Sequence, residues 1–122
     1  MSGHPSAADL IDSVRGFLAE LEPGLSGRQA FHAKVAGNVL ALVQRELRQQ
    51  PDTVEIDALS RLLGRAAPLA ELRAEACAAL RDGRLDDRTP GLLDALTAAT
   101  LARLAVDNPK FSTYRRLTEP KP

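Results

Sequence analysis

The sequence predicts an all-α protein, a single-domain antiparallel bundle of about five helices. Apolar residues recur at spacings of three and four throughout the chain, which is the period of an amphipathic helix. Aromatic residues make up only 3% and Trp is absent, so the core is Leu, Val and Ala, which suits helices better than a sandwich. Gly and Pro fall where the periodic segments end, as helix stops do.

The first helix is expected from Ser6 to Leu21. Ser6 and Asp9 have the spacing of a capping box, in which each side chain satisfies a backbone N–H of the first turn. Pro23-Gly24 ends this helix. Its apolar residues at helical spacing are Leu10, Ile11, Val14, Phe17, Leu18 and Leu21.

The second helix, residues 26–50, is the longest, and it ends before Pro51. Ser26 and Gln29 repeat the capping-box spacing. At about 100° per residue, the following apolar residues share one broad arc: Phe31, Val35, Val39, Leu42, Val43 and Leu47. A second face carries Lys34, Asn38 and Arg45. Three polar residues fall unexpectedly within the apolar arc: Arg28, His32 and Glu46.

Start and stop residues delimit each of the remaining three helices. The third is expected to begin at Asp52 or Thr53 and to end at Gly64, and the fourth to begin at Pro68 and to end at Gly83. The fifth is expected to begin at Thr89-Pro90 and to end before Pro109. Pro109 keeps Asn108 out of helical geometry, so the fifth helix ends at about Asp107. We therefore expect a helical domain over residues 1–110 and a polar, loosely ordered tail over residues 111–122.

Charge and composition narrow the classes of function. Sixteen basic and sixteen acidic residues cancel, so neither nucleic acid nor an anionic membrane is favoured as a partner. No apolar run reaches the roughly 18–20 residues of a membrane span, and residues 1–5 lack a signal-peptide pattern. A cytoplasmic location is the default expectation. The single Cys77 excludes an internal disulfide framework and is expected to be buried filler.

Motifs of catalysis are not found in the sequence. It contains no Gly-rich phosphate loop with its Lys, no spacing of Cys and His typical of a metal site, and no nucleophile-elbow pattern. We therefore expect a protein that is not an enzyme and that carries no cofactor or metal.

Four polar residues of the second helix are candidates for a partner-binding or phosphate-binding face. They are Arg28, Lys34, Asn38 and Arg45. A solvated helix face is the alternative interpretation for this stripe. For His32 the alternatives are a hydrogen bond to a neighbouring residue or a ligand contact.

Charged residues on apolar faces suggest a structural polar cluster. Glu46 and the Arg103–Asp107 pair lie on the apolar sides of the second and fifth helices, and buried charge is costly unless paired. We expect these groups to meet each other, with a contribution from His32 or Arg28, or else to face a partner. The motif Asn108-Pro109-Lys110-Phe111 is either a docking motif or a helix stop followed by an anchoring aromatic residue.

The sequence resembles a bacterial family of small helical proteins that is catalogued mainly as a domain of unknown function. The resemblance rests on five stretches: Gly27–Asn38, Arg45-Glu46-Leu47, Leu104–Phe111, Pro5–Ile11 and Arg81-Asp82-Gly83. One departure is Lys34, where the family more often has Arg, so a bidentate clamp there is in doubt.

This resemblance implies a partner. The family is typically encoded beside an aminoglycoside-phosphotransferase-like kinase and an acyl-CoA dehydrogenase. The resemblance implies that this chain is an accessory subunit, which binds a kinase and stabilises or activates it. The kinase would act on a hydroxyacyl-CoA in levulinate-type catabolism. Two alternatives stay open: a small enzyme or direct acyl-CoA binder that uses Arg28, Lys34 and Arg45 on phosphate, and a structural homo-oligomer.

Overall fold

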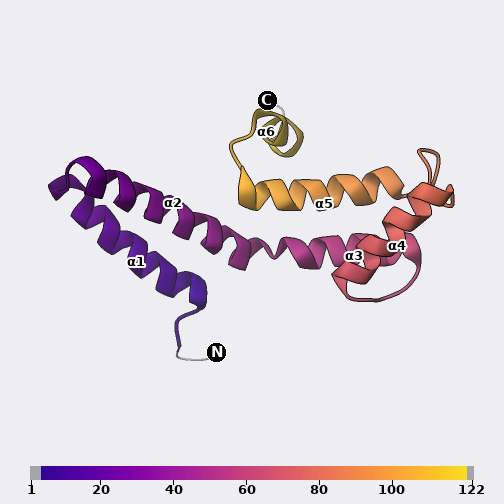
Figure 1. Ribbon diagram of the computed structural model, residues 1–122, viewed down its shortest axis with the longest axis horizontal. Coiled ribbons are helices and arrows are strands. Elements are labelled where there is room, and N and C mark those ends of the chain that lie inside the picture. The colour runs from indigo at the N-terminus through magenta and orange to yellow at the C-terminus, as the bar shows by residue number, and fades with distance from the viewer. Residues whose placement is uncertain (1–3, 121–122) are drawn as a thin grey trace. The chain divides into compact units, whose positions relative to one another are not determined.

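A computed structural model describes residues 4–120, and the all-α prediction is confirmed: these residues form helices and no strand (Figure 1). The elements are α1 (Ala7–Leu21), the 3-10 turn η1 (Glu22–Gly24), α2 (Gly27–Gln49), α3 (Pro51–Leu63), α4 (Leu69–Asp82), α5 (Leu92–Asp107) and α6 (Ser112–Thr118). The chain folds as two compact units, residues 1–49 and 50–122. Within residues 4–120, no helix has the length and apolar character that crossing a membrane requires.

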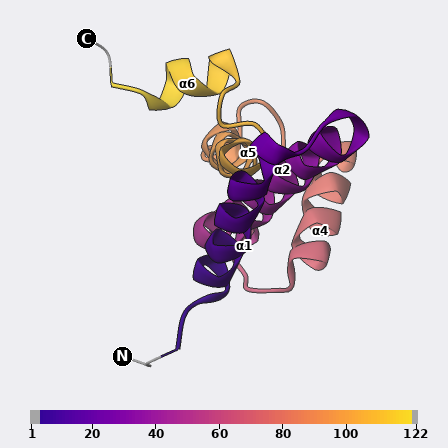
Figure 2. The same ribbon diagram turned by 90° about the vertical axis from the view of Figure 1, so that its left-hand side faces the viewer.

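Unit 1, residues 1–49, is a helical hairpin in which α1 and α2 run antiparallel (Figures 1 and 2). The predicted capping box is present, since the Asp9 N–H donates to Ser6 Oγ at 3.1 Å and the Ser6 N–H donates to Asp9 Oδ2 at 3.3 Å. Small and apolar residues pack between the two helices, and Ala8 and Gln44 are buried there. The larger apolar side chains of both helices are mostly exposed.

Unit 2, residues 50–122, is built on the antiparallel pair α3 and α5, with α4 packed against α3 and α6 against α5 (Figures 1 and 2). Its core joins Ala79, Leu85 and Leu92, with Leu62 and Leu63 packed against them. Leu72 of α4 is completely buried.

Glycines stop two helices of unit 2 as the sequence predicts. Gly64 (φ 74°) and Gly83 (φ 85°) are the C-terminal caps of α3 and α4, and both have the left-handed conformation that glycine adopts without a Cβ clash.

The starts of α3 and α5 differ from the prediction. Pro51 itself is the first residue of α3, after Gln50 in the left-handed conformation, so neither Asp52 nor Thr53 caps this helix. The expected cap at Thr89 is also wrong, because α5 begins at Leu92 behind Gly91 (φ 86°). The Thr89 hydroxyl instead accepts a hydrogen bond from the Asp86 N–H at 2.9 Å within the preceding loop.

The tail expected over residues 111–122 contains a sixth helix. Residues 112–118 form α6, and the Arg115 N–H donates to the Phe111 carbonyl at 3.0 Å to begin its hydrogen-bond ladder. Phe111, Tyr114 and Leu117 give this short segment an apolar side against α5, which its polar composition obscures. The outermost residues of the predicted domain and tail, 1–3 and 121–122, lie outside the described residues.

Candidate functional site

The buried centre of the unit 1 hairpin is a glutamine with a complete set of partners. Gln44 on α2 is 2% exposed. Its Nε2 donates to the Ala8 carbonyl at 2.9 Å and to Asp12 Oδ1 at 3.1 Å, while its Oε1 accepts from Arg15 Nη1 at 2.7 Å. Buried polar groups are stable only when they are hydrogen-bonded in this way. The network therefore fixes the position of α1 along α2, and no sequence motif singles it out.

Two of the predicted partner-face residues line a hollow beside this network. Lys34 and Asn38 of α2 face Arg15 and Glu22, and the hollow has a volume of about 250 Å³. Glu22 places a carboxylate among the cations, which favours a polar partner over a bare phosphate anion. Within residues 4–120, the hollow thus brings together part of the predicted face: its lining includes Lys34 and Asn38 but neither Arg28 nor Arg45.

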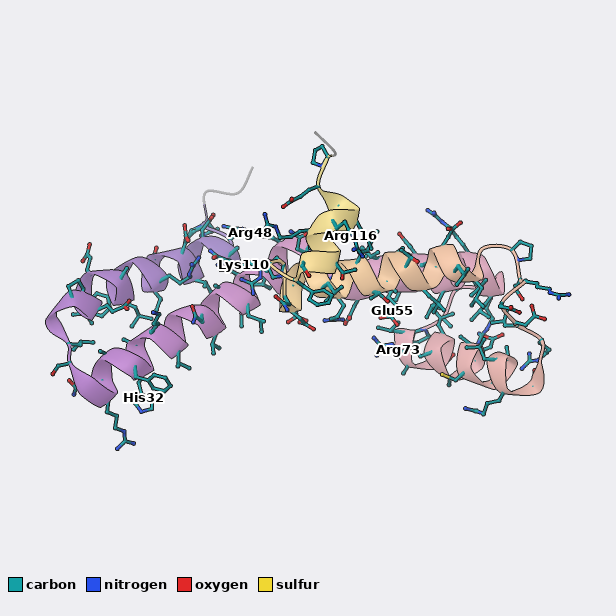
Figure 3. The ribbon with its side chains drawn as sticks, turned by 90° about the horizontal axis from the view of Figure 1, so that it is seen from above. His32, Arg48, Glu55, Arg73, Lys110 and Arg116 are labelled. Carbon is teal, nitrogen blue, oxygen red and sulfur yellow. The ribbon has the colours of Figure 1, made fainter. Side chains whose placement is uncertain are left out.

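Arg28 lies about 120° from Lys34 around the helix axis, on the apolar arc of α2. Its Nε donates to His32 Nε2 at 3.1 Å, so this nitrogen of His32 acts as an acceptor. The His32 ring stands edge-on to Phe31, with the ring centroids 5.7 Å apart. In Figure 3 His32 projects from α2 away from α1. Of the two interpretations of His32, the structure has the hydrogen bond to a neighbouring residue.

Ion pairs join the helices of unit 2. Arg103 of α5 donates to Asp52 of α3. Arg73 of α4 donates from Nε and Nη2 to the two carboxylate oxygens of Glu55 on α3, at 2.7 and 2.6 Å (Figure 3). The hydrogen bonds from Arg73 lower the pKa of Glu55, and burial opposes this effect only in part.

For the predicted cluster of Glu46, Arg103 and Asp107, the structure shows an ion pair of Arg103 with a residue outside the cluster. Arg103 pairs with Asp52, an acid that the sequence suggests only as a helix cap. Glu46 belongs to unit 1 and Arg103 to unit 2, so their pairing stays a prediction. Asp107 is exposed at the last residue of α5.

The motif Asn108-Pro109-Lys110-Phe111 connects α5 to α6. The helix stop is confirmed: α5 ends at Asp107, and the Asn108 N–H donates to the Leu104 carbonyl at 2.9 Å. The Phe111 N–H then donates to the Asn108 carbonyl at 3.1 Å, which turns the chain toward α6. Lys110 is exposed on this connection (Figure 3).

Phe111 lines an apolar groove between α5 and α6, which we call the α5–α6 groove. It has a volume of about 350 Å³. Ten residues line it: Leu93, Leu96, Thr97, Thr100, Leu101, Leu104, Phe111, Thr113, Tyr114 and Leu117. The leucines at its edge are largely exposed, Leu93 by 65% and Leu117 by 61%. Such a surface can bury apolar side chains or an acyl chain.

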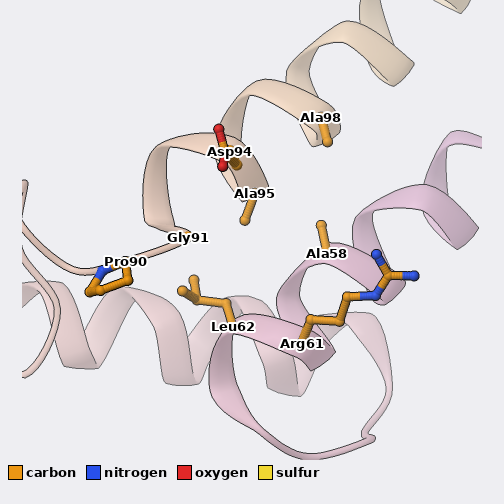
Figure 4. A pocket seen from close by; sticks show the side chains of 8 residues that line it. All are labelled: Ala58, Arg61, Leu62, Pro90, Gly91, Asp94, Ala95 and Ala98. Atoms are coloured by element: carbon orange, nitrogen blue, oxygen red, sulfur yellow. The ribbon is translucent and has the colours of Figure 1, made fainter.

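A further hollow of about 400 Å³ lies between α3 and α5 (Figure 4). Arg61 of α3 and Asp94 of α5 supply its charges, and the lining between them includes Leu62 and small side chains such as Ala58 and Ala95. The charges are of opposite sign and come from different helices, so this hollow offers a small zwitterionic surface.

The described residues offer neither a cluster of metal ligands nor a buried thiol. Among residues 4–120, no group of three or more His, Cys, Asp or Glu side chains is placed to hold a metal ion. Cys77, expected to be buried, is exposed on α4. The α4 positions that are buried are Leu72 and Ala79, and Cys77 lies on another side of the same helix.

Comparison with known proteins identifies a family. A family model described as a domain of unknown function, DUF6285, matches residues 23–111. The match runs from the η1 turn through α5 to Phe111, the residue that closes the α5–α6 connection. No curated protein and no solved structure matches the chain.

Proposed function

The chain belongs to the DUF6285 family, and from that premise we propose that it is a non-catalytic accessory subunit that binds a partner protein through the α5–α6 groove. The observation that carries this proposal is the apolar lining of the groove on two helices, with Leu93 and Leu117 left largely exposed at its edge. Contiguous exposed apolar surface of this kind is typical of protein interaction sites.

The shape of the groove favours a helix of the partner. Its lining residues on α5 recur at helical spacing, and α6 forms the opposite wall. An amphipathic helix docks in such a groove by placing apolar anchors at positions i, i+3 and i+7. Lys110 and Arg116, both exposed around α6, favour acidic residues beside those anchors.

We further propose that the partner is an aminoglycoside-phosphotransferase-like kinase acting on a hydroxyacyl-CoA in bacterial acyl-CoA catabolism. This proposal is supported by the resemblance to the family encoded beside such kinases. In this role the accessory subunit stabilises the kinase, or its active conformation, by binding that state preferentially.

A second candidate function is direct binding of the acyl chain of a CoA ester. The groove volume of about 350 Å³ is within the usual range for small-molecule sites, and the lining is apolar. This alternative places the acyl chain in the α5–α6 groove, away from Lys34 and the polar hollow of unit 1.

Co-purification with an aminoglycoside-phosphotransferase-like kinase from the same organism tests the proposal. Leu93→Glu puts a charge at the groove, and we expect it to weaken kinase capture at least tenfold, since burying a leucine contributes about 1.5–3 kcal/mol. Leu80→Glu makes the same change at an exposed leucine of α4 outside the groove and should leave capture unchanged.

Each alternative has its own outcome. Equal capture of the kinase by Leu93→Glu and by the parent chain would contradict docking in the groove. Binding of hexanoyl-CoA to the isolated chain, measured by calorimetry and lost in Leu93→Glu, would instead favour the acyl-binding alternative. Failure of the parent chain to capture the kinase would refute the kinase as partner.

A further inference from the structure

The hairpin of unit 1 leaves nine large apolar side chains exposed, five on α2 and four on α1. On α2 they lie at every fourth residue: Phe31, Val35, Val39, Val43 and Leu47. On α1 they are Leu10, Val14, Phe17 and Leu21. We call these nine residues the hairpin face. We infer that the hairpin face binds a second copy of the chain, with α2 antiparallel to α2 of the other copy about a two-fold axis at Val39.

Helix geometry places the nine side chains on one side of the hairpin. At about 100° per residue, the exposed stripe of each helix is displaced by roughly 110–140° from the residues packed inside the hairpin. The displacement is counter-clockwise for both helices when each is viewed from its N-terminus. Because α1 and α2 are antiparallel, the same sense of rotation brings both stripes to the same side. The hairpin face is therefore continuous across the two helices.

The pattern along α2 is symmetric about Val39. Phe31 and Leu47 are equidistant from it, and so are Val35 and Val43. A two-fold interface requires a surface that complements itself, because residue i of one copy meets residue j of the other and the reverse. In the antiparallel register about Val39, apolar residues meet apolar residues at each of these positions.

The charges on the apolar arc have the same symmetry. His32 and Glu46 are also equidistant from Val39, and both fall on the arc that carries Val39. The register places the Arg28–His32 pair of one copy beside Glu46 of the other, at both ends of the interface. A carboxylate can accept several hydrogen bonds, so Glu46 can contribute here together with its contacts within the chain. This pairing explains why polar residues occur within an apolar arc.

The area is sufficient for a stable dimer. The nine side chains are 37–65% exposed. Together they expose on the order of 800 Å², about what each partner contributes to a standard protein interface. A hairpin of this size also has a small interior of its own, with Ala8 and Gln44 as its buried residues. Stacking two hairpins gives four helices around a shared apolar core.

The symmetry allows a test by charge exchange at Val39. In the full-length chain, Val39→Asp places two carboxylates together at the axis, and Val39→Lys places two ammonium groups there. We expect each variant alone to weaken dimerisation at least 100-fold, while an equimolar mixture of the two restores a dimer. Asn38→Lys is the matched control, since Asn38 lines the hollow on the other side of α2. Molar mass is measured by light scattering, and helix content by circular dichroism.

The outcomes decide the inference. A parent chain that stays at its single mass of 13.1 kDa at high concentration would overturn the dimer. A dimer in which Val39→Asp has no effect, or a mixture that stays monomeric, would overturn the register about Val39. Where a charged variant loses its helix content, Val39→Cys in a Cys77→Ser chain supplies the second test. Oxidation should link two Val39→Cys chains through position 39, whereas Asn38→Cys in the same background should stay unlinked, and the reverse result would contradict the inference.

Discussion

Replacing Gln44 by Met is expected to destabilise the α1–α2 hairpin strongly. The two side chains have similar length and volume, so little is lost in packing. What is lost is the hydrogen bonds to the Ala8 carbonyl, Asp12 and Arg15, at 2.9, 3.1 and 2.7 Å. At a net contribution of about 0.5–1.5 kcal/mol for each bond, the free energy of unfolding should fall by about 2–4 kcal/mol.

The assay is urea unfolding at fixed protein concentration, followed by circular dichroism. With a slope of about 1–3 kcal/mol per molar urea, the midpoint should move down by on the order of 1 M. Amide hydrogen exchange locates the effect, because the loss of protection should begin in α1 and α2 and spare the core around Leu72 in unit 2.

Gln49→Met is the matched control, since Gln49 is an exposed glutamine at the last residue of α2. Its substitution should change the free energy of unfolding by less than about 0.5 kcal/mol. If Gln44→Met unfolds at the same urea concentration as Gln49→Met, the network does not hold the hairpin.

Two further predictions concern the Glu55–Arg73 ion pair of unit 2 and the backbone conformation of two glycines, one in each unit. The pKa of Glu55 is lowered from its ordinary value of 4.5 by the hydrogen bonds from Arg73. The pairing therefore contributes its full stability at pH values above 4.5, and this contribution is lost as the pH falls through the lowered pKa. Glu55→Gln should therefore cost about 1 kcal/mol at neutral pH and flatten the fall of the urea midpoint below pH 4.5, and an unchanged slope there would contradict this. Gly83→Ala should cost about 1–2 kcal/mol, because φ is 85° although no atom lies within 4 Å of the new Cβ. Gly16→Ala within α1, equally free of neighbours, should stabilise by about 0.5–1 kcal/mol, and thermal melts that show the same sign for both would refute the backbone argument.

The sequence predicts most of the helices because their signals are local. The Ser6–Asp9 capping box and the glycine stops at Gly64 and Gly83 each depend on residues within one turn, and all three are present. The cap at Thr89 was wrong because Asp86 competes for the same hydroxyl group in the loop. The helix in the tail was missed because its apolar residues are few, and their packing against α5 decides its structure.

The sequence predicts which residues share a face of one helix, but it does not predict which residues of other helices they contact. The polar positions of α2 could be assigned to faces from helical periodicity, and the structure does bring Lys34 and Asn38 together. The pairing of Arg103 with Asp52 joins residues 51 positions apart in the chain. Periodicity within one helix carries no information about which residue of another helix it meets, so contacts of this kind come only from the tertiary structure.

On α2, a polar residue fixes the position of the two helices of the hairpin, and apolar residues form its exposed face. If large apolar side chains alone held α1 to α2, several helix registers would have similar energies, because apolar contacts are not directional. Gln44 has directional bonds to Ala8, Asp12 and Arg15, and it is satisfied in one register only. Gln44 is accompanied by half-buried residues of both kinds, small ones such as Ala33 and Gly37 and larger ones such as Leu18 and Leu40. The nine residues of the hairpin face remain exposed, so a second chain can cover them without disturbing the contacts that hold the hairpin together.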